Sequence, residues 1–131
     1  MNLTPSLSIL ATFLVGLAHA SDYDPAWNAG GMGPDNFSWE RKVPRSIIEK
    51  APYWTPGQGA IPVSPDQACE KAAAAFSQLG LGTSTFKALQ LLANKARPTT
   101  YTISLEDKDG HSLDFLIFMD GTVISPVITR K

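Results

Sequence analysis

One short helix with both ends marked in the sequence constrains this chain most. Ser64 is an N-cap, Pro65 occupies the first helical position, and Gln67 stands three residues after the cap to complete a capping box. Gly80 supplies a left-handed cap at the other end, so the pattern predicts a helix from Pro65 to Leu79. Its apolar face is mostly alanine, which favours close packing on a sheet: Ala68, Ala72, Ala75, Phe76 and Leu79.

Three runs after this helix are typical of β-strands and are separated by glycine-containing turns: residues 100–106, 112–119 and 122–128. In the first run, apolar and polar residues alternate, which predicts one buried and one wet face. The second run is apolar on both sides near its end, which predicts a central strand. Pro126 predicts that the third run is an edge strand, because proline lacks the backbone N–H group that a central strand would donate to its neighbour.

Residues 85–92 fit either a helix or a strand. Phe86, Leu89 and Leu92 have helical spacing, whereas alternate positions also separate into two strand faces. We expect a strand, because it would complete an antiparallel meander over the alanine face of the helix. The sequence therefore predicts an α+β fold in residues 63–131, with one N-capped helix packed on a three- or four-stranded antiparallel sheet.

Residues 21–62 show no sustained helix or strand period, apart from a single possible helical turn at residues 45–50. We expect an extended arm containing proline, glycine and tryptophan, in which Gly30–Gly33 forms a flexible turn. Whether residues 21–51 are ordered stays open at this point. The aromatic residues of the arm either pack on their own domain or form a platform for a sugar or a peptide. The candidate binding residues are Tyr53, Trp54 and Trp39.

The first twenty residues are typical of a signal peptide. An apolar stretch from Leu7 to Leu17 precedes Ala18-His19-Ala20, whose small outer residues fit a signal-peptidase site, and predicts cleavage before Ser21. The apolar run is short for a membrane span. We therefore expect an exported protein, periplasmic or secreted, with no stable membrane insertion after the leader is removed.

The charge of the chain argues against nucleic-acid binding. Eleven Lys and Arg residues oppose twelve Asp and Glu residues, for a net charge of −1. Arg41, Lys42 and Arg45 form the only basic cluster, and the acidic residues among them are typical of a solvated face. Cys69 is the only cysteine, which excludes an intramolecular disulfide and a cysteine-cluster zinc site. We expect it to pack as a small apolar residue on the buried side of the helix.

Catalytic patterns are weak in this sequence. His111 is the one histidine after the leader, and its position in a predicted hairpin loop favours a solvated side chain. A pairing of Cys69 with His111 is disfavoured, because Cys69 should face the sheet and not the hairpin tip. Asp107 and Asp109 resemble the start of a calcium loop, but the EF-hand register would place leucine where acidic ligands are required. We therefore expect no catalytic residue, no metal and no cofactor.

The arrangement from Ile61 to Ile128 resembles the PepSY and PepSY-like small exported domains. The resemblance covers about half of the chain and lies in Ser64 and Ala68 at the helix start, and in Asp120-Gly121 at the last turn. Pro52-Tyr53-Trp54-Thr55-Pro56 also looks like the lead-in of uncharacterised secreted bacterial proteins of this kind. The segment Leu81–Arg97 departs from the family pattern. The resemblance implies a non-catalytic module associated with peptidase inhibition or with binding of secreted or envelope proteins.

These features lead to two functional hypotheses. The first is an exported, non-catalytic module that binds a polypeptide and modulates a peptidase or an envelope protein, with pairing at a sheet edge as the favoured mode. The alternative is a small secreted hydrolase or metal-dependent enzyme that uses the acidic hairpin around His111, with Asp107, Asp109 and Asp114. The sequence identifies neither the partner nor the oligomeric state.

Overall fold

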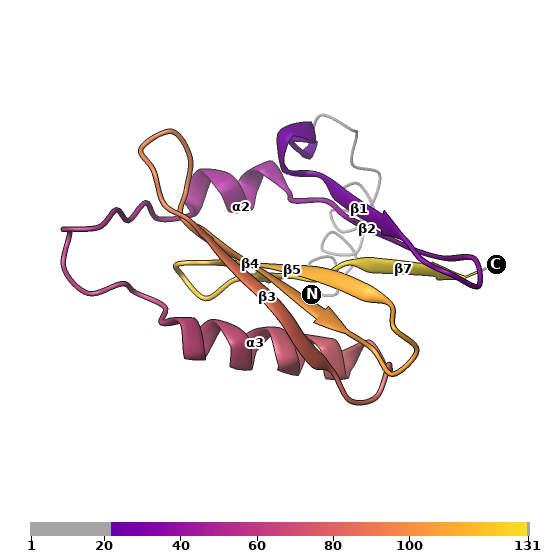
Figure 1. Ribbon diagram of the computed structural model, residues 1–131. Helices are drawn as coiled ribbons and strands as arrows, with labels where there is room; N and C mark the ends of the chain where they lie inside the picture. Colours follow the sequence, from indigo (N-terminus) through magenta and orange to yellow (C-terminus); the bar gives the residue numbers. More distant parts are fainter. Residues whose placement is uncertain (1–21, 131) are drawn as a thin grey trace, which may run out of the picture.

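A computed structural model describes residues 22–130 of the chain (Figure 1). The predicted leader and its cleavage site before Ser21 lie outside the described residues. The elements in chain order are η2 (Pro25–Trp27), β1 (Ala29–Met32), β2 (Phe37–Arg41), α2 (Arg45–Lys50), α3 (Pro65–Gln78), β3 (Thr85–Leu92), β4 (Thr100–Glu106), β5 (Ser112–Phe118), β6 (Val123–Ile124) and β7 (Val127–Arg130). One antiparallel sheet has the order β3-β4-β5-β6, and the other has the order β1-β2-β7. The α+β class is confirmed.

Helix α3 forms where its caps predicted it. The backbone N–H of Gln67 donates to Oγ of Ser64 at 3.2 Å, and the backbone N–H of Ser64 donates to Oε1 of Gln67 at 2.9 Å, which completes the capping box. The helix ends at the cap residue Leu79, and Gly80 has a φ of 73°. Its buried side chains lie over β4 and β5, and among them are Ala68, Ala72, Ala75 and Phe76.

The four-stranded sheet confirms the strand interpretation of residues 85–92, which form β3 and pair along β4. The buried residues of β4 and β5 lie opposite one another, with Tyr101 beside Ile117 and Ile103 beside Phe115. The hydroxyl of Tyr101 donates to the backbone oxygen of Val63 at 2.7 Å, which ties the segment before α3 to the sheet. The predicted central position of β5 is also confirmed.

The last predicted strand, residues 122–128, is in fact two strands that belong to different sheets. Val123–Ile124 forms β6 beside β5, whereas Val127–Arg130 forms β7 beside β2. Pro126 separates them, because it lacks an N–H and fixes φ. Both strands lie at a sheet edge, as the proline predicted.

The expectation of an extended arm over residues 21–62 is wrong for much of its length. Residues 22–50 include η2, the β1–β2 hairpin and α2, which confirms the helical turn at residues 45–50. Gly30 and Gly31 lie in strand β1 and not in a flexible turn. A Cβ atom on Gly31 would lie 2.5 Å from Nε1 of Trp39, so glycine is required for the indole to cross the strand. Glycine has no side chain and so shows no alternation of apolar and polar residues, which is why the sequence did not predict strand β1.

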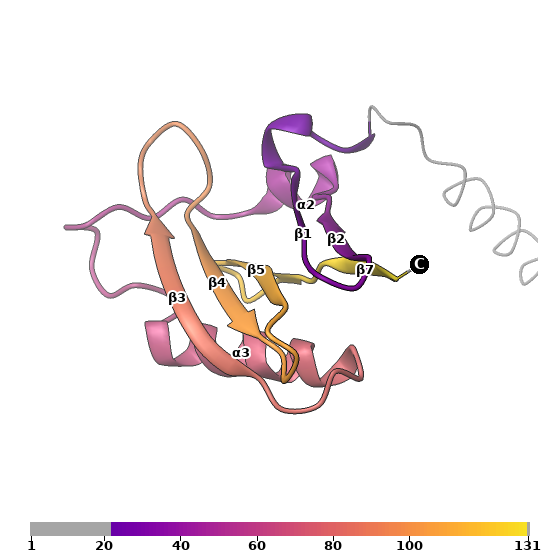
Figure 2. The ribbon, with the colours of Figure 1, turned by 45° about the vertical axis from the view of Figure 1, so that its right-hand side comes forward.

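The four-stranded sheet is covered on both faces. Helix α3 covers one face, and η2, β2 and α2 lie on the other side (Figures 1 and 2). Trp27, Val43 and Ala51 pack there with Leu116 and Phe118 of β5. This second core explains why β5 is apolar on both sides. Within residues 22–130, no helix is long and apolar enough to cross a membrane.

Candidate functional site

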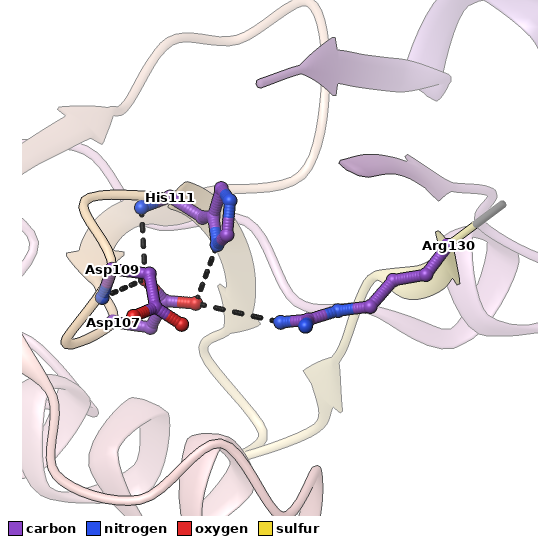
Figure 3. Close-up of polar contacts among 4 residues, drawn as sticks. All are labelled: Asp107, Asp109, His111 and Arg130. Carbon is purple, nitrogen blue, oxygen red and sulfur yellow. Dashed lines mark hydrogen bonds and ion pairs between the residues drawn. The ribbon is translucent and has the colours of Figure 1, made fainter. Parts of the chain in front are cut away.

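The loop between β4 and β5 brings Asp107 and His111 together (Figure 3). Oδ1 of Asp107 accepts the backbone N–H of Asp109 at 2.9 Å and that of His111 at 2.8 Å. Oδ2 of Asp107 lies 2.8 Å from Nδ1 of His111. Nη2 of Arg130, on β7, lies 4.0 Å from the same oxygen. The carboxylate of Asp107 thus accepts the hydrogen bonds that hold the turn between β4 and β5 together.

The prediction of a solvated His111 is wrong. The residue is only 3% exposed, and its ring stacks on that of Phe37 with the ring centroids 4.0 Å apart. Gly33 lies over the ring edge, where an added Cβ would be 3.1 Å from Cδ2 of His111. The β1–β2 hairpin therefore covers this loop. Sequence reasoning missed the contact because Phe37 and Gly33 lie far from His111 along the chain.

Burial and hydrogen bonding act on Asp107 in opposite directions. Burial raises the pKa of Asp107, but the hydrogen bonds from His111 and Asp109 and the charge of His111 outweigh it, so the pKa lies below its ordinary value. The side chain is therefore a carboxylate at neutral pH, and Nδ1–H of His111 donates to it. Nε2 of His111 is buried and has no hydrogen-bond partner among residues 22–130.

The same three residues are the candidate ligands for a metal. Donor atoms of Asp107, Asp109 and His111 all lie within 4.8 Å of one another. Two ligands of a tetrahedral zinc ion are separated by about 3.3 Å, because each lies about 2.0–2.1 Å from the metal. The 2.8 Å distance from Oδ2 of Asp107 to Nδ1 of His111 is that of a hydrogen bond, and Oδ1 already accepts two N–H groups. The geometry fits a structural turn better than a metal centre.

Cys69 has the environment of a packing residue. It lies on α3, is partly buried and packs against the main core. Burial, together with the charge of Asp66, raises the pKa of its thiol. Because the thiolate is the nucleophilic form, a raised pKa makes this thiol less reactive at neutral pH.

The three aromatic residues predicted to bind a ligand do not form one exposed platform. Trp39 lies in the core beneath β1 and is only 8% exposed, which leaves little of its ring accessible to a ligand. Trp54 is partly buried, and its backbone N–H donates to Oγ1 of Thr99 at 2.7 Å. Tyr53 is 55% exposed. A binding role in this region therefore rests on Tyr53 and on the free side of Trp54.

Strand β3 is one of the two edge strands of the larger sheet, and it is longer than β6 at the other edge. It pairs with β4 on one side, and no other strand within residues 22–130 pairs with its second side. Phe86 is 54% exposed, and Leu91 and Leu92 are also exposed. Proteins commonly protect such an edge with lysine or a β-bulge. Here Lys87 and the bulge between Phe86 and Ala88 lie near the start of the strand, and the stretch from Ala88 to Leu92 has neither.

Comparisons with known proteins identify no family for this chain. No family model matches it, and neither the curated proteins nor the solved structures contain a significant match. The resemblance to PepSY-like domains therefore stays a prediction based on Ser64, Ala68, Asp120 and Gly121.

Proposed function

We propose that this protein is a non-catalytic binding module that holds an extended polypeptide along the free edge of β3. The observation that carries the proposal is the unpaired edge from Ala88 to Leu92 with its exposed apolar side chains. An extended peptide can add a strand to such an edge, so that its backbone satisfies the unpaired N–H and C=O groups.

The register of β3 defines the peptide that fits this edge. Phe86 lies opposite Leu105, and Leu91 lies opposite Tyr101. Leu105 and Tyr101 belong to the core beneath α3, so Phe86 and Leu91 also point to the face of the sheet that α3 covers. Leu89, between them, packs against the core. An added strand would place every second side chain beside this apolar face. The preferred partner is therefore a segment with apolar residues at alternate positions.

The non-catalytic part of the proposal is supported by the packing of the only histidine within residues 22–130. His111 is enclosed by Phe37 and Gly33, and Asp107 is occupied by three hydrogen-bond donors. A general base needs access to the proton that it removes. The packing of these two residues therefore favours a non-catalytic module over the hydrolase alternative.

The edge can be tested with a displayed library of random linear peptides. We expect enriched peptides with apolar residues at alternate positions, and we expect them to slow hydrogen exchange of the β3 amides. Leu91→Lys should abolish this binding, because a charge would lie at the centre of the apolar contact. Gln78→Lys adds the same charge at an exposed position of α3 and should leave binding unchanged.

Two results would contradict the edge proposal. One is the absence of enriched peptides, and the other is protection of amides elsewhere in the chain with unchanged exchange in β3. Concentration-dependent dimers that disappear in Leu91→Lys would instead identify a second copy of this chain as the occupant. Sedimentation velocity of the two variants distinguishes that outcome.

We also propose that the protein acts outside the cytoplasm, on an exported peptidase or an envelope protein. The support is the sequence pattern of residues 1–20 and the resemblance to PepSY-like domains. The amino-terminal sequence of the protein from fractionated native cells tests this point. A chain that begins at Ser21 outside the cytoplasm is expected, whereas a cytoplasmic chain that retains residues 1–20 would contradict the proposal.

A further inference from the structure

A small pocket lies on the side of the four-stranded sheet opposite α3. It has a volume of about 200 Å³, and its walls come from η2, β2, β3, β4, β5 and the loop before β4. The polar and aromatic side chains that matter here are Trp27, Arg41, Gln90, Arg97, Thr100 and Thr102. The pocket is separate from the Asp107–His111 turn, and none of its residues was among the predicted binding residues.

Arg41 is the most unusual residue of this pocket. Strand β2 places it on the same side as Phe37 and Trp39, so it points inward and is only 7% exposed. This corrects the expectation that Arg41 belongs to a solvated basic face. Its Nε and Nη1 atoms are buried and have no hydrogen-bond partner within residues 22–130. Burying donors without partners is costly, and more so when the group is charged.

A nearby acid only partly offsets this cost. Burial lowers the pKa of Arg41, and the charge of Asp114 acts in the opposite direction. Asp114 does not lie within ion-pair distance of Arg41, and its Oδ1 accepts a hydrogen bond from the hydroxyl of Ser104 at 2.6 Å. The guanidinium remains charged, as arginine does in proteins.

Arg97 supplies a second guanidinium to the same pocket. It lies over Trp27, with its Cζ atom 3.8 Å from the ring centroid, and Trp27 in turn stacks on Phe118. This stacking fixes the guanidinium plane and leaves the N–H groups at its edge for a ligand. Nε of Arg97 is also buried without a partner in the described chain. Two arginines therefore line one pocket, and their donors without partners lie beneath its surface.

We propose that this pocket binds the carboxylate group of a small acid or of a peptide. The residues that line the pocket include two guanidinium groups and no carboxylate, so their charge favours an anion. The planar guanidinium binds a planar carboxylate through two parallel hydrogen bonds. The pocket volume admits a small acid or the end of a chain, but not a large ligand.

The site can be tested with acetate as the probe, by following the Nε–H resonances of the arginines in the ¹⁵N-labelled protein. We expect the resonances of Arg41 and Arg97 to move and to saturate as sodium acetate is added at constant ionic strength. Sodium chloride at the same concentrations should not move them in this way. Equal shifts with chloride, or shifts that do not saturate, would overturn the proposal, because both indicate charge screening alone.

Variants separate the pocket from the overall charge. Arg97→Gln should weaken acetate binding by about tenfold or more, since a hydrogen bond to a charged group is lost. Lys42→Gln removes the same charge from a neighbouring exposed residue outside the pocket and should change binding by less than about twofold. Arg97 is only partly buried, so its variant keeps the test available if a substitution of the more deeply buried Arg41 fails to fold. Equal effects of Arg97→Gln and Lys42→Gln would refute the site.

Inorganic phosphate tests the assigned ligand class. If the ligand is a carboxylate, acetate should bind at least as tightly as phosphate at neutral pH. Tighter binding of phosphate would overturn the carboxylate assignment.

A peptide selected on the β3 edge distinguishes the two sources of carboxylate. Gln90 and Leu92 contribute to the pocket from β3, so the end of a bound peptide can reach it. If a peptide carboxylate is the ligand, the free acid should bind about tenfold more tightly than the amide, and Arg97→Gln should remove the difference. Equal affinities identify a free small acid as the ligand. The acetate titration does not depend on peptide binding, so failure of the edge proposal and failure of this one are distinguishable.

Discussion

Replacing Asp107 by alanine should lower the free energy of unfolding by about 3–5 kcal/mol. The carboxylate accepts two backbone N–H groups and the ring N–H of His111 in a space that is almost closed to water. A hydrogen bond to a charged group contributes about 1.5–3 kcal/mol, but the three are not additive because they share one acceptor group. Alanine also leaves Nδ1–H of His111 buried without a partner. The estimate therefore corresponds to the loss of about two hydrogen bonds to a charged group.

Urea unfolding at neutral pH measures this loss, and the same loop supplies the control. Asp109 is exposed, and its backbone N–H, which donates to Asp107, is unaffected by a change of side chain. Asp109→Ala should change the free energy of unfolding by no more than about 0.5 kcal/mol. Equal destabilisation by both variants, or a loss of less than about 1 kcal/mol in Asp107→Ala, would refute the structural role of the turn.

Four further outcomes are expected. The pKa of Asp107 in the folded protein lies below its unfolded value of about 3.9, so the carboxylate stabilises the fold fully above that pH. This stabilisation is lost as pH falls through the folded pKa. The difference in unfolding free energy between wild type and Asp107→Asn should therefore shrink below about pH 4. Gly31→Ala should cost about 1–3 kcal/mol in urea unfolding, since its Cβ would overlap the indole of Trp39; an unchanged midpoint would contradict the close approach. Ser64→Ala should cost about 1 kcal/mol through loss of the helix cap, again measured with urea. Alkylation of Cys69 by iodoacetamide near pH 8 should be slower in the folded than in the urea-unfolded protein, whereas equal rates would contradict its raised pKa.

The parts of the fold that were predictable are those specified by neighbouring residues. The cap of α3 is formed by Ser64 and Gln67, three positions apart, and the alternation in β4 lies within seven residues. Strand β3 was identified from context, because its own residues fit a helix equally well. Local chemistry therefore predicted α3 and the four-stranded sheet.

The parts that were missed depend on contacts between distant segments. The indole of Trp39 lies against Gly31, so a side chain at that position of β1 would clash with it. The ring of Phe37 stacks on His111 and covers it. Strand β2 does alternate in polarity, but its inward-facing series ends in Arg41, which hid the pattern. A five-residue strand with a charged inward residue gives too weak a period to recognise in sequence.

Arg41 and His111 are both buried polar residues beneath the amino-terminal segment, but their surroundings differ. Each has a buried nitrogen without a partner within residues 22–130, but Nδ1–H of His111 donates to an ionised partner at 2.8 Å, whereas the charged Arg41 forms no ion pair within these residues. An apolar residue at position 41 would continue the inward series of Phe37 and Trp39 and would avoid the cost of burying a charge. Arg41→Met should therefore be at least as stable to urea as the wild type, while acetate binding is lost. A charged group that costs stability and has no ion-pair partner is expected at a ligand site, because an anion in the pocket offsets its charge. Marked destabilisation of Arg41→Met would instead show that Arg41 serves the fold, and would remove the physical reason for placing a ligand beside it.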